Sequence, residues 1–315
     1  MTQIDKSRFE WIGSDSARRE GISRPSTTFW KDAIGRLMKN KVAVVCFFII
    51  VLLILSCIVV PFFSPFESRE QHLGEVNKGF MTVCTDSRYE GQHHVHYFGT
   101  DNLGRDLFLR AFEGGRVSLM IAFAAVFVNL IVGLIYGGIS GYIGGAVDTI
   151  MMRIVEIVNG IPYLIVVILL MMVLPKGIFT MVVAYGITGW TGMARLVRGQ
   201  VLQLKSQEYI VAAEAMGAKS SRIIAKHLIP NALSVIIITL AIPSAIFTEA
   251  FLSYIGLGVP VPQPSWGVLA KGGQDVFMTY PYQLVVPAVA ISLTMLSFNL
   301  LGDGLRDAFD PRLRR

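Results

Sequence analysis

The segment QEYIVAAEAMGAKSSRIIAKHLIPN, residues 207–231, decides how this sequence is interpreted. It is polar and helix-prone, yet it lies between two long apolar stretches. The pattern predicts a short helix over residues 211–216 that ends at Gly217, because glycine fits the left-handed conformation that often follows a helix C-terminus. Pro230 suits the first turn of the next helix. A short helix of small residues between apolar stretches is suited to lying against a partner, since alanines let two surfaces approach closely.

The composition of the whole chain is that of a membrane protein. Its 315 residues are 53% hydrophobic and only 16% charged, and the mean hydropathy is +0.57. A soluble domain carries roughly a quarter charged residues. Six segments are apolar enough to cross a bilayer about 30 Å thick, namely residues 42–63, 117–141, 154–174, 178–194, 231–248 and 284–301. The first, third and sixth are the clearest. The sequence therefore predicts an all-α membrane protein with six transmembrane helices.

The distribution of basic residues predicts the orientation of these helices. With both termini in the cytoplasm, the N-terminal tail holds nine Lys and Arg, the connection 141–153 one, the connection after the fourth span six and the C-terminal tail four, which places 20 of the 28 inside. This is the positive-inside bias. The net charge of +6 is thus explained by topology and not by nucleic-acid binding. No cleavable signal peptide is expected, because the first apolar run begins only at Val42 and is too long for one.

An amphipathic segment precedes the first span. Apolar residues recur at helical spacing within residues 26–41, while the lysines and arginines between them can reach lipid headgroups. The sequence leaves two interpretations open: a separate helix at the inner membrane surface, or an extension of the first span. The three cysteines provide no disulfide framework, because Cys46 and Cys57 lie in the first span and only Cys84 lies outside.

Glycines mark two further features of the chain. Within FGTDNLGRDL, residues 98–107, Gly99 and Gly104 allow tight turns, and charged side chains can pair to hold the segment together, namely Asp101, Arg105 and Asp106. In the second span, Gly133, Gly137, Gly141 and Gly145 recur every fourth residue. This stripe predicts close packing against another helix, with a pore wall as the alternative. Residues 256–267 are rich in Gly and Pro and predict a shaped outer loop, in which Trp266 suits the membrane interface.

The sequence lacks the motifs of an enzyme. No G-x-x-x-x-G-K-[ST] phosphate loop is present, so any ATP hydrolysis belongs to another polypeptide. No serine, histidine and aspartate grouping or H-E-x-x-H motif lies in the apolar spans. The loop histidines His93, His94 and His96, with His72 and Cys84, offer soft ligands, but a polar loop predicts that they face solvent. We therefore expect no metal and no cofactor bound by this chain.

Two acidic residues lie within or beside the apolar spans, Glu156 and Glu249. Carboxylates inside a membrane are functional candidates, and a proton-coupled secondary transporter would use them as relays. Glu156 follows Arg153 by three residues, and Glu249 begins the irregular outer connection that follows the fifth span, residues 231–248. Both are therefore interpreted as interfacial groups, and a proton-coupled carrier remains the competing class.

The opening segment resembles the cytoplasmic coupling loop of ABC-importer permeases, which reads Glu-Ala-Ala, three residues, Gly, nine residues, then an apolar residue, any residue, Leu and Pro. Val211 replaces the glutamate, while His227 and Ile229 replace the usual apolar residue and leucine. Such a loosened motif resembles the peptide-importer branch. The resemblance implies that the loop contacts the ATPases through Tyr209, Val211, Ala212, Ala213, Glu214, Ala215, Gly217, His227 and Pro230.

Residues 98–119 and the C-terminal stretch 302–312 also resemble the dipeptide and oligopeptide permeases, and the pre-membrane segment 29–45 extends the similarity to nearly the whole chain. The nearest type is the C-type membrane subunit. The resemblance implies import of peptides through a pore shared with a related permease subunit. It also implies two ATPase subunits that bind ATP and Mg, an extracytoplasmic peptide-binding protein, and a place in the bacterial cytoplasmic membrane. Import of nickel or another small solute by the same branch is the alternative.

This resemblance divides the chain into five parts. Residues 1–41 form a cytoplasmic tail with the amphipathic helix, and residues 42–63 form the first span. Residues 64–116 form an extracytoplasmic loop, and residues 117–302 form the permease core with its coupling loop at 205–230. Residues 303–315 form a second cytoplasmic tail.

Overall fold

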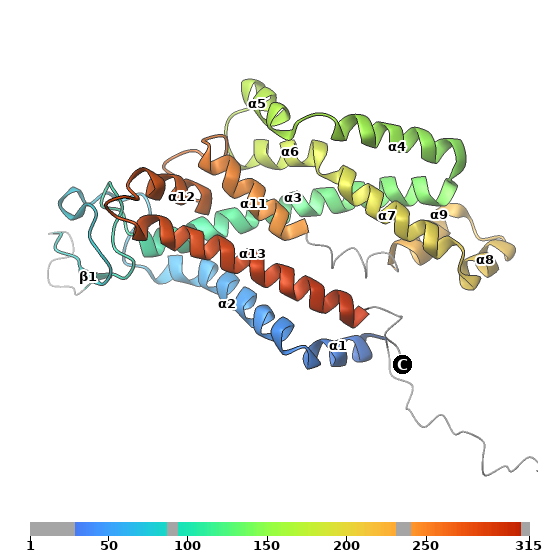
Figure 1. Ribbon diagram of the computed structural model, residues 1–315, viewed down its shortest axis with the longest axis horizontal. Helices are drawn as coiled ribbons and strands as arrows, with labels where there is room; N and C mark the ends of the chain where they lie inside the picture. Colours follow the sequence, from blue (N-terminus) through green and yellow to red (C-terminus); the bar gives the residue numbers. More distant parts are fainter. Residues whose placement is uncertain (1–28, 87–93, 231–240, 310–315) are drawn as a thin grey trace, which may run out of the picture.

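The computed structural model describes residues 29–86, 94–230 and 241–309, and it is almost entirely helical (Figure 1). Its α-helices are α1 (Phe29–Lys39), α2 (Lys41–Phe63), α3 (Leu107–Ile143), α4 (Gly145–Asn159), α5 (Tyr163–Val173), α6 (Ile178–Thr188), α7 (Trp190–Lys205), α8 (Glu208–Ala215), α9 (Ser220–Ile223), α11 (Ala241–Tyr254), α12 (Trp266–Asp275) and α13 (Tyr282–Phe309). A 3-10 turn, η3 (Leu73–Glu75), a π-helical turn, η5 (Ile224–Leu228), and the antiparallel strands β1 (Thr82–Val83) and β2 (Val95–His96) complete the described part. The predicted all-α class is confirmed.

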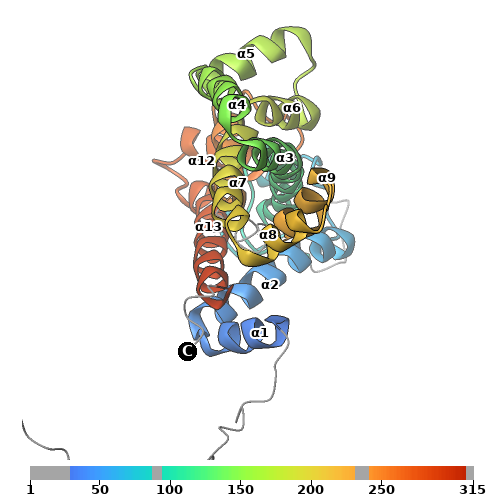
Figure 2. The ribbon, with the colours of Figure 1, turned by 90° about the vertical axis from the view of Figure 1, so that its right-hand side faces the viewer.

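The molecule is elongated, and its two ends differ. Helices α2, α3 and α13 run along the long axis in Figure 1, with β1 and its surroundings at one end and α8 and α9 at the other. In the view of Figure 2, α4, α5 and α6 lie on one side of the central helices and α1 and α2 lie on the other. The described part of the predicted extracytoplasmic loop 64–116, here called the outer subdomain, and the coupling segment 207–230 therefore occupy opposite ends of the bundle.

Three helices in the described ranges are long and apolar enough to cross a membrane alone: α2, α3 and α13. Helices α4 and α5 together pass the same test, although they bend by 75° between them. Helix α6 is apolar but shorter, and the fifth predicted span begins in residues 231–240, which lie outside the described residues. The structure thus confirms a membrane protein with several spans, and the count of six stays a prediction.

The third predicted span, residues 154–174, is not a continuous helix. It breaks between Asn159 and Tyr163, at the sequence Gly160, Ile161 and Pro162. Pro162 has no N–H to donate, and its backbone is extended at ψ 124°, so the helix cannot run through it. The fourth predicted span also divides, because α6 ends at Thr188 and α7 starts at Trp190.

The amphipathic segment before the first span is a separate helix. Helix α1 ends at Lys39, and Asn40 adopts an extended conformation at ψ 92°. The Asn40 side chain then accepts a hydrogen bond from the Ala43 backbone N–H at 3.1 Å and so caps the start of α2. Of the two interpretations left open by the sequence, the structure supports the separate helix.

The glycine stripe of the second span packs α3 against α7. A Cβ on Gly133 would lie 2.5 Å from the Met193 side chain, and one on Gly137 would lie 2.3 Å from the Ala194 carbonyl oxygen. Gly141 is similarly close to the Arg198 backbone, at 3.0 Å. Three members of the stripe therefore confirm the packing interpretation. Gly145 does not belong to it, because it follows the end of α3 and starts α4 with a φ of +58°.

Candidate functional site

The coupling segment forms the helix predicted from its sequence. Helix α8 spans Glu208–Ala215, and Gly217 follows it with a φ of +79°. The Gly217 N–H donates to the Glu214 carbonyl at 2.9 Å, and the Ala218 N–H donates to the Ala213 carbonyl at 3.0 Å. These two bonds form the Schellman motif that favours glycine at a helix end. The predicted stop at Gly217 is confirmed, and the helix begins three residues earlier than expected.

Helix α8 has one buried face and one exposed face. Ile210 and Ala213 are buried, and Ile210 joins a hydrophobic cluster with α7 residues such as Val197 and Val201. Ala213, which the sequence assigned to the partner contact, therefore faces the core of its own chain. The remaining side chains of the predicted contact set on this helix are exposed, namely Tyr209, Val211, Ala212, Glu214 and Ala215.

Two polar contacts hold the end of α3, one to α8 through Glu214 and one to the last residue of α7, Lys205. The Tyr142 hydroxyl donates to a Glu214 carboxylate oxygen at 3.0 Å, and Lys205 Nζ donates to the Tyr142 carbonyl at 2.6 Å. The Lys205 ammonium also lies 5.2 Å from the centre of the Tyr142 ring. Sequence reasoning missed Tyr142 and Lys205, because they lie 63 residues apart and no local pattern pairs them.

A separate polar cluster around the Asp148 carboxylate joins α3, α4 and α7 near the same end. Arg198 in α7 donates two hydrogen bonds of 2.5 Å to the Asp148 carboxylate in α4, one from Nε and one from Nη2. Ser140 in α3 donates to the same carboxylate at 2.5 Å. A bidentate arginine–carboxylate pair fixes geometry as well as charge. The short helix α8 is therefore mounted on a rigid frame of α3, α4 and α7.

The end of the coupling segment is also helical. His227 lies in the π-helical turn η5 and is half-buried, whereas the next residue, Leu228, is fully buried in the cluster that contains Ile210. Pro230 is exposed and helical at the point where this described range ends. The structure thus brings the start and the end of the coupling segment onto one hydrophobic cluster.

The segment FGTDNLGRDL, residues 98–107, is held by the charge pairing that its sequence predicted. Arg105 Nε donates to Asp101 at 2.7 Å, and the Arg105 backbone N–H donates to the other oxygen of the same carboxylate. Gly104 has a φ of +73°, and a Cβ there would lie 2.0 Å from the His72 carbonyl oxygen. Gly99, with a φ of +75°, faces the Lys78 carbonyl in the same way. No residue but glycine fits either turn.

Asp106 has two roles in this outer subdomain. One carboxylate oxygen accepts from the Leu109 backbone N–H at 2.7 Å and caps the start of α3. The other contacts His96 Nδ1 at 2.7 Å, and His96 Nε2 lies 3.2 Å from the Glu75 carboxylate. Burial lowers the pKa of His96, but the two carboxylates outweigh it and hold that pKa above its ordinary value.

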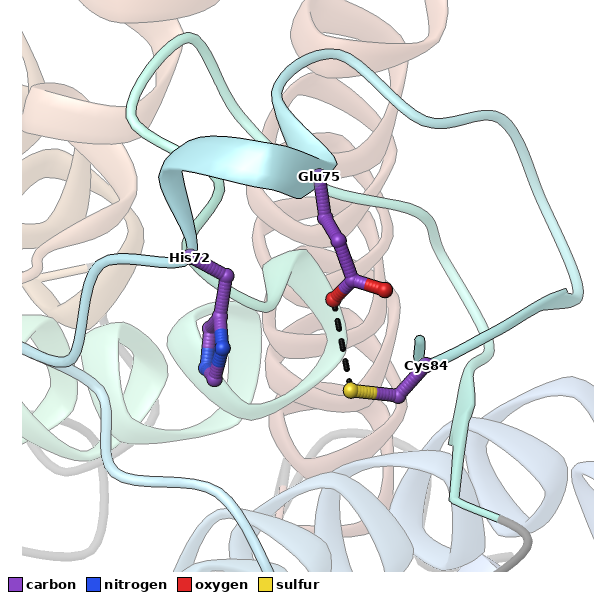
Figure 3. A group of neighbouring side chains, drawn as sticks. All are labelled: His72, Glu75 and Cys84. Carbon is purple, nitrogen blue, oxygen red and sulfur yellow. Dashed lines mark hydrogen bonds between the residues drawn. The ribbon is translucent and has the colours of Figure 1, made fainter. Parts of the chain in front are cut away.

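The outer histidines are not solvent-facing as the sequence predicted. His72 and His96 are buried, and His96 contacts a third buried group, Glu75. Figure 3 shows His72 and Glu75 together with the buried Cys84. The Cys84 thiol donates to Glu75 at 3.3 Å, and burial raises the pKa of this thiol to about 11. The prediction failed because it judged a polar loop by local composition, whereas η3, β1 and β2 fold these residues inward. His93 lies outside the described residues.

Two further sequence interpretations are corrected. Glu249 is not an interfacial group: it lies within α11, is 2% exposed, and accepts a hydrogen bond from Ser253 at 2.7 Å. Trp266 is not in a membrane-interface belt: it is 1% exposed, and its Nε1 donates to the Ala111 carbonyl at 2.9 Å. Glu156 does fit the interfacial interpretation, because it is exposed and pairs with Arg153 at 2.7 Å.

Comparison with known proteins gives consistent matches over the whole chain. Residues 130–315 match the family described as binding-protein-dependent transport system inner membrane component, and residues 28–79 match the N-terminal TM domain of oligopeptide transport permease C. The chain is 49% identical to the oligopeptide transport system permease protein OppC of Bacillus subtilis (strain 168) over 100% of both chains. It is 47% identical to the dipeptide transport system permease protein DppC of the same organism, over 94% of this chain and 90% of the relative. It is 42% identical to the oligopeptide transport system permease protein OppC of Escherichia coli (strain K12), over 99% of both chains.

Proposed function

Because this chain belongs to the family of binding-protein-dependent transport system inner membrane components, we propose that it is one membrane-spanning half of an ATP-driven importer of oligopeptides or dipeptides. The observation that carries the proposal is the exposed side of α8, presented at the end of the bundle opposite the outer subdomain (Figure 1). A helix with one exposed face, anchored to its own chain by the buried side chains of its other face, is suited to receive force from a partner. ATP and Mg belong to separate ATPase subunits, and the chain itself catalyses no reaction.

The mechanism follows from how α8 is mounted. Movement of an ATPase against α8 is transmitted to α7 through the buried Ile210 and to α3 through the Tyr142–Glu214 hydrogen bond. The Asp148 carboxylate, which accepts from Arg198 of α7 and from Ser140 of α3, and the glycine contacts make α3 and α7 move as one body. Rocking of this body would open the pore alternately to the outside and to the cytoplasm. ATP drives the change only if the ATPases bind the two states with different free energies.

The remaining partners follow from the same proposal. A related permease subunit supplies the other half of the pore, and an extracytoplasmic binding protein delivers peptide to the outer subdomain. Selection among peptides rests with that binding protein. The peptide backbone is the same in every sequence, so a wide, water-filled pore that makes few side-chain contacts does not distinguish one peptide from another. The complex lies in the bacterial cytoplasmic membrane with the α8 end in the cytoplasm.

Reconstitution tests the proposed function directly. The chain, its partner permease and the two ATPase subunits would be placed in liposomes with the binding protein and a labelled peptide. We expect uptake that requires ATP and the binding protein together, and that persists after a protonophore removes any proton gradient. Uptake driven by a proton gradient without ATP would contradict the proposal and favour a secondary carrier, and uptake of Ni²⁺ but not of peptide would favour a nickel importer.

The proposed orientation predicts a pattern of chemical labelling. Ser206 and Gln274 are both exposed, at opposite ends of the molecule, and the cysteines in the described ranges are buried. With cysteine introduced at each position in turn, a membrane-impermeant maleimide should modify Gln274→Cys in intact cells and Ser206→Cys only after permeabilisation. The unsubstituted chain measures the background. Labelling of Ser206→Cys from outside would overturn the orientation and the coupling proposal together.

A further inference from the structure

The outer subdomain contains a closed cluster of metal-binding groups that the transport mechanism does not use. His72, Glu75 and Cys84 are all buried, and their ligand atoms lie within 4.8 Å of one another. His72 directly precedes η3, Glu75 is its last residue, and Cys84 directly follows β1; Figure 3 shows the three side chains turned toward one another. The fully buried His96 in β2 joins them, since its Nε2 lies 3.2 Å from the Glu75 carboxylate.

The separations within the cluster fit a tetrahedral metal site. Zinc bonds to nitrogen, oxygen and sulfur of about 2.0–2.3 Å place neighbouring ligand atoms roughly 3.3–3.8 Å apart. The Glu75 oxygen is already 3.3 Å from the Cys84 sulfur and 3.2 Å from His96 Nε2. His72, Glu75 and Cys84 have ligand atoms within 4.8 Å of one another, so their separations need to shrink by at most about 1 Å to meet the same geometry. His96 reaches these three through its contact with Glu75, and its ring has to turn further toward the centre to complete the site.

Each histidine also has the second contact that is typical of a metal ligand. His72 Nδ1 lies 2.7 Å from an Asp86 carboxylate oxygen, and His96 Nδ1 lies 2.7 Å from an Asp106 carboxylate oxygen. A carboxylate only accepts, so each Nδ1 carries the hydrogen and each Nε2 is the atom directed to a metal. A further carboxylate oxygen, from Glu70, lies 3.7 Å from His72 Nε2. The surplus of carboxylates favours a divalent cation at the centre.

We propose that His72, Glu75, Cys84 and His96 bind one structural Zn²⁺ ion that fixes the outer subdomain. One thiolate, two imidazoles and one carboxylate form a ligand set that suits zinc, and four protein ligands with no open position are typical of structural sites. Binding displaces the Cys84 thiol proton and the proton between His96 Nε2 and Glu75, and both are released to solvent. The ion would join η3, the residue after β1 and strand β2. This proposal replaces the expectation from sequence that the chain binds no metal, and it does not depend on the cargo of the transporter.

The test measures metal on the purified full-length chain, isolated in detergent through an affinity tag that contains no histidine. We expect about one zinc per chain by elemental mass spectrometry, and at least fivefold less for Cys84→Ser, since loss of a ligand weakens binding strongly. Serine keeps a hydroxyl that can donate to Glu75, so this variant preserves the hydrogen bond that would hold a metal-free cluster. Cys46→Ser, a buried thiol near the far end of α2, is the matched control and should retain its zinc.

Two further readouts separate metal binding from folding. Replacing zinc by Co²⁺ should give a thiolate-to-cobalt charge-transfer band in the wild-type chain and in Cys46→Ser, but not in Cys84→Ser. A zinc chelator should lower the thermal unfolding temperature of the wild-type chain and leave that of Cys84→Ser unchanged. Wild-type chain without stoichiometric zinc, or zinc retained fully by Cys84→Ser, would show that the cluster is held by hydrogen bonds alone and would overturn the proposal.

Discussion

Gly217→Val is expected to reduce substrate-stimulated ATP hydrolysis and peptide uptake by about tenfold, while the chain still reaches the membrane at normal abundance. Gly217 has a φ of +79° and closes α8 through its hydrogen bond to Glu214. A left-handed conformation costs a β-branched residue roughly 1–2 kcal/mol, which corresponds to a factor of about ten. The residue lies outside the apolar spans, so insertion should not change. Both activities would be measured on the reconstituted complex.

The control variants separate backbone strain from steric conflict. A Cβ on Gly217 would meet no atom within 4 Å, so the effect of valine comes from the backbone conformation and not from crowding within this chain. Asparagine tolerates the left-handed region, and Gly217→Asn should therefore keep most of the activity. Ser220→Ala should stay fully active. Normal transport by Gly217→Val would remove the main support for α8 as the coupling element.

The features predicted correctly from the sequence are those that depend on neighbouring residues. The Schellman turn at Gly217 rests on chemistry within five residues. The charge pairing of Asp101 with Arg105 is also local, at a separation of four residues. Composition is similarly robust, since a chain with 53% hydrophobic residues and few charges must bury its helices in lipid or in one another. These features could be predicted because no distant contact decides them.

The features predicted wrongly depend on contacts that are distant in sequence. The sequence predicts an interfacial position for Trp266, yet its ring is buried. The indole N–H donates to a carbonyl 155 residues earlier in the chain, that of Ala111. The loop histidines looked exposed, yet His96 contacts Glu75 from 21 residues away through the pairing of β1 with β2. The break at Pro162 is different, because the proline is a local signal that could have predicted it. Hydropathy averaged over a long window is little changed by one proline, and such an average therefore predicts a single span where α4 and α5 are separate helices.

Adding one methyl group at two adjacent positions of α3 should change stability in opposite directions. At Gly137 the new Cβ would lie 2.3 Å from the Ala194 carbonyl oxygen and 2.8 Å from the Val197 side chain, and the α7 backbone cannot yield without moving the helix. At Gly138 it would find only Ile224, at an ordinary 3.6 Å. Overpacking costs about 1–3 kcal/mol, whereas alanine in place of glycine otherwise stabilises a helix by up to about 1 kcal/mol.

Gly137→Ala should therefore lower the thermal unfolding temperature in detergent by roughly 5 °C and reduce the amount of chain in the membrane, while Gly138→Ala should match or exceed the wild type. The comparison isolates the contact with α7, because both variants carry the same substitution in the same helix, and the new Cβ meets α7 only at Gly137. Since α3 and α7 must move together to transmit force from α8, a Gly137→Ala chain that survives should also transport poorly. Equal stability of the two variants would mean that the glycine stripe does not hold α3 against α7, and that it faces the pore instead.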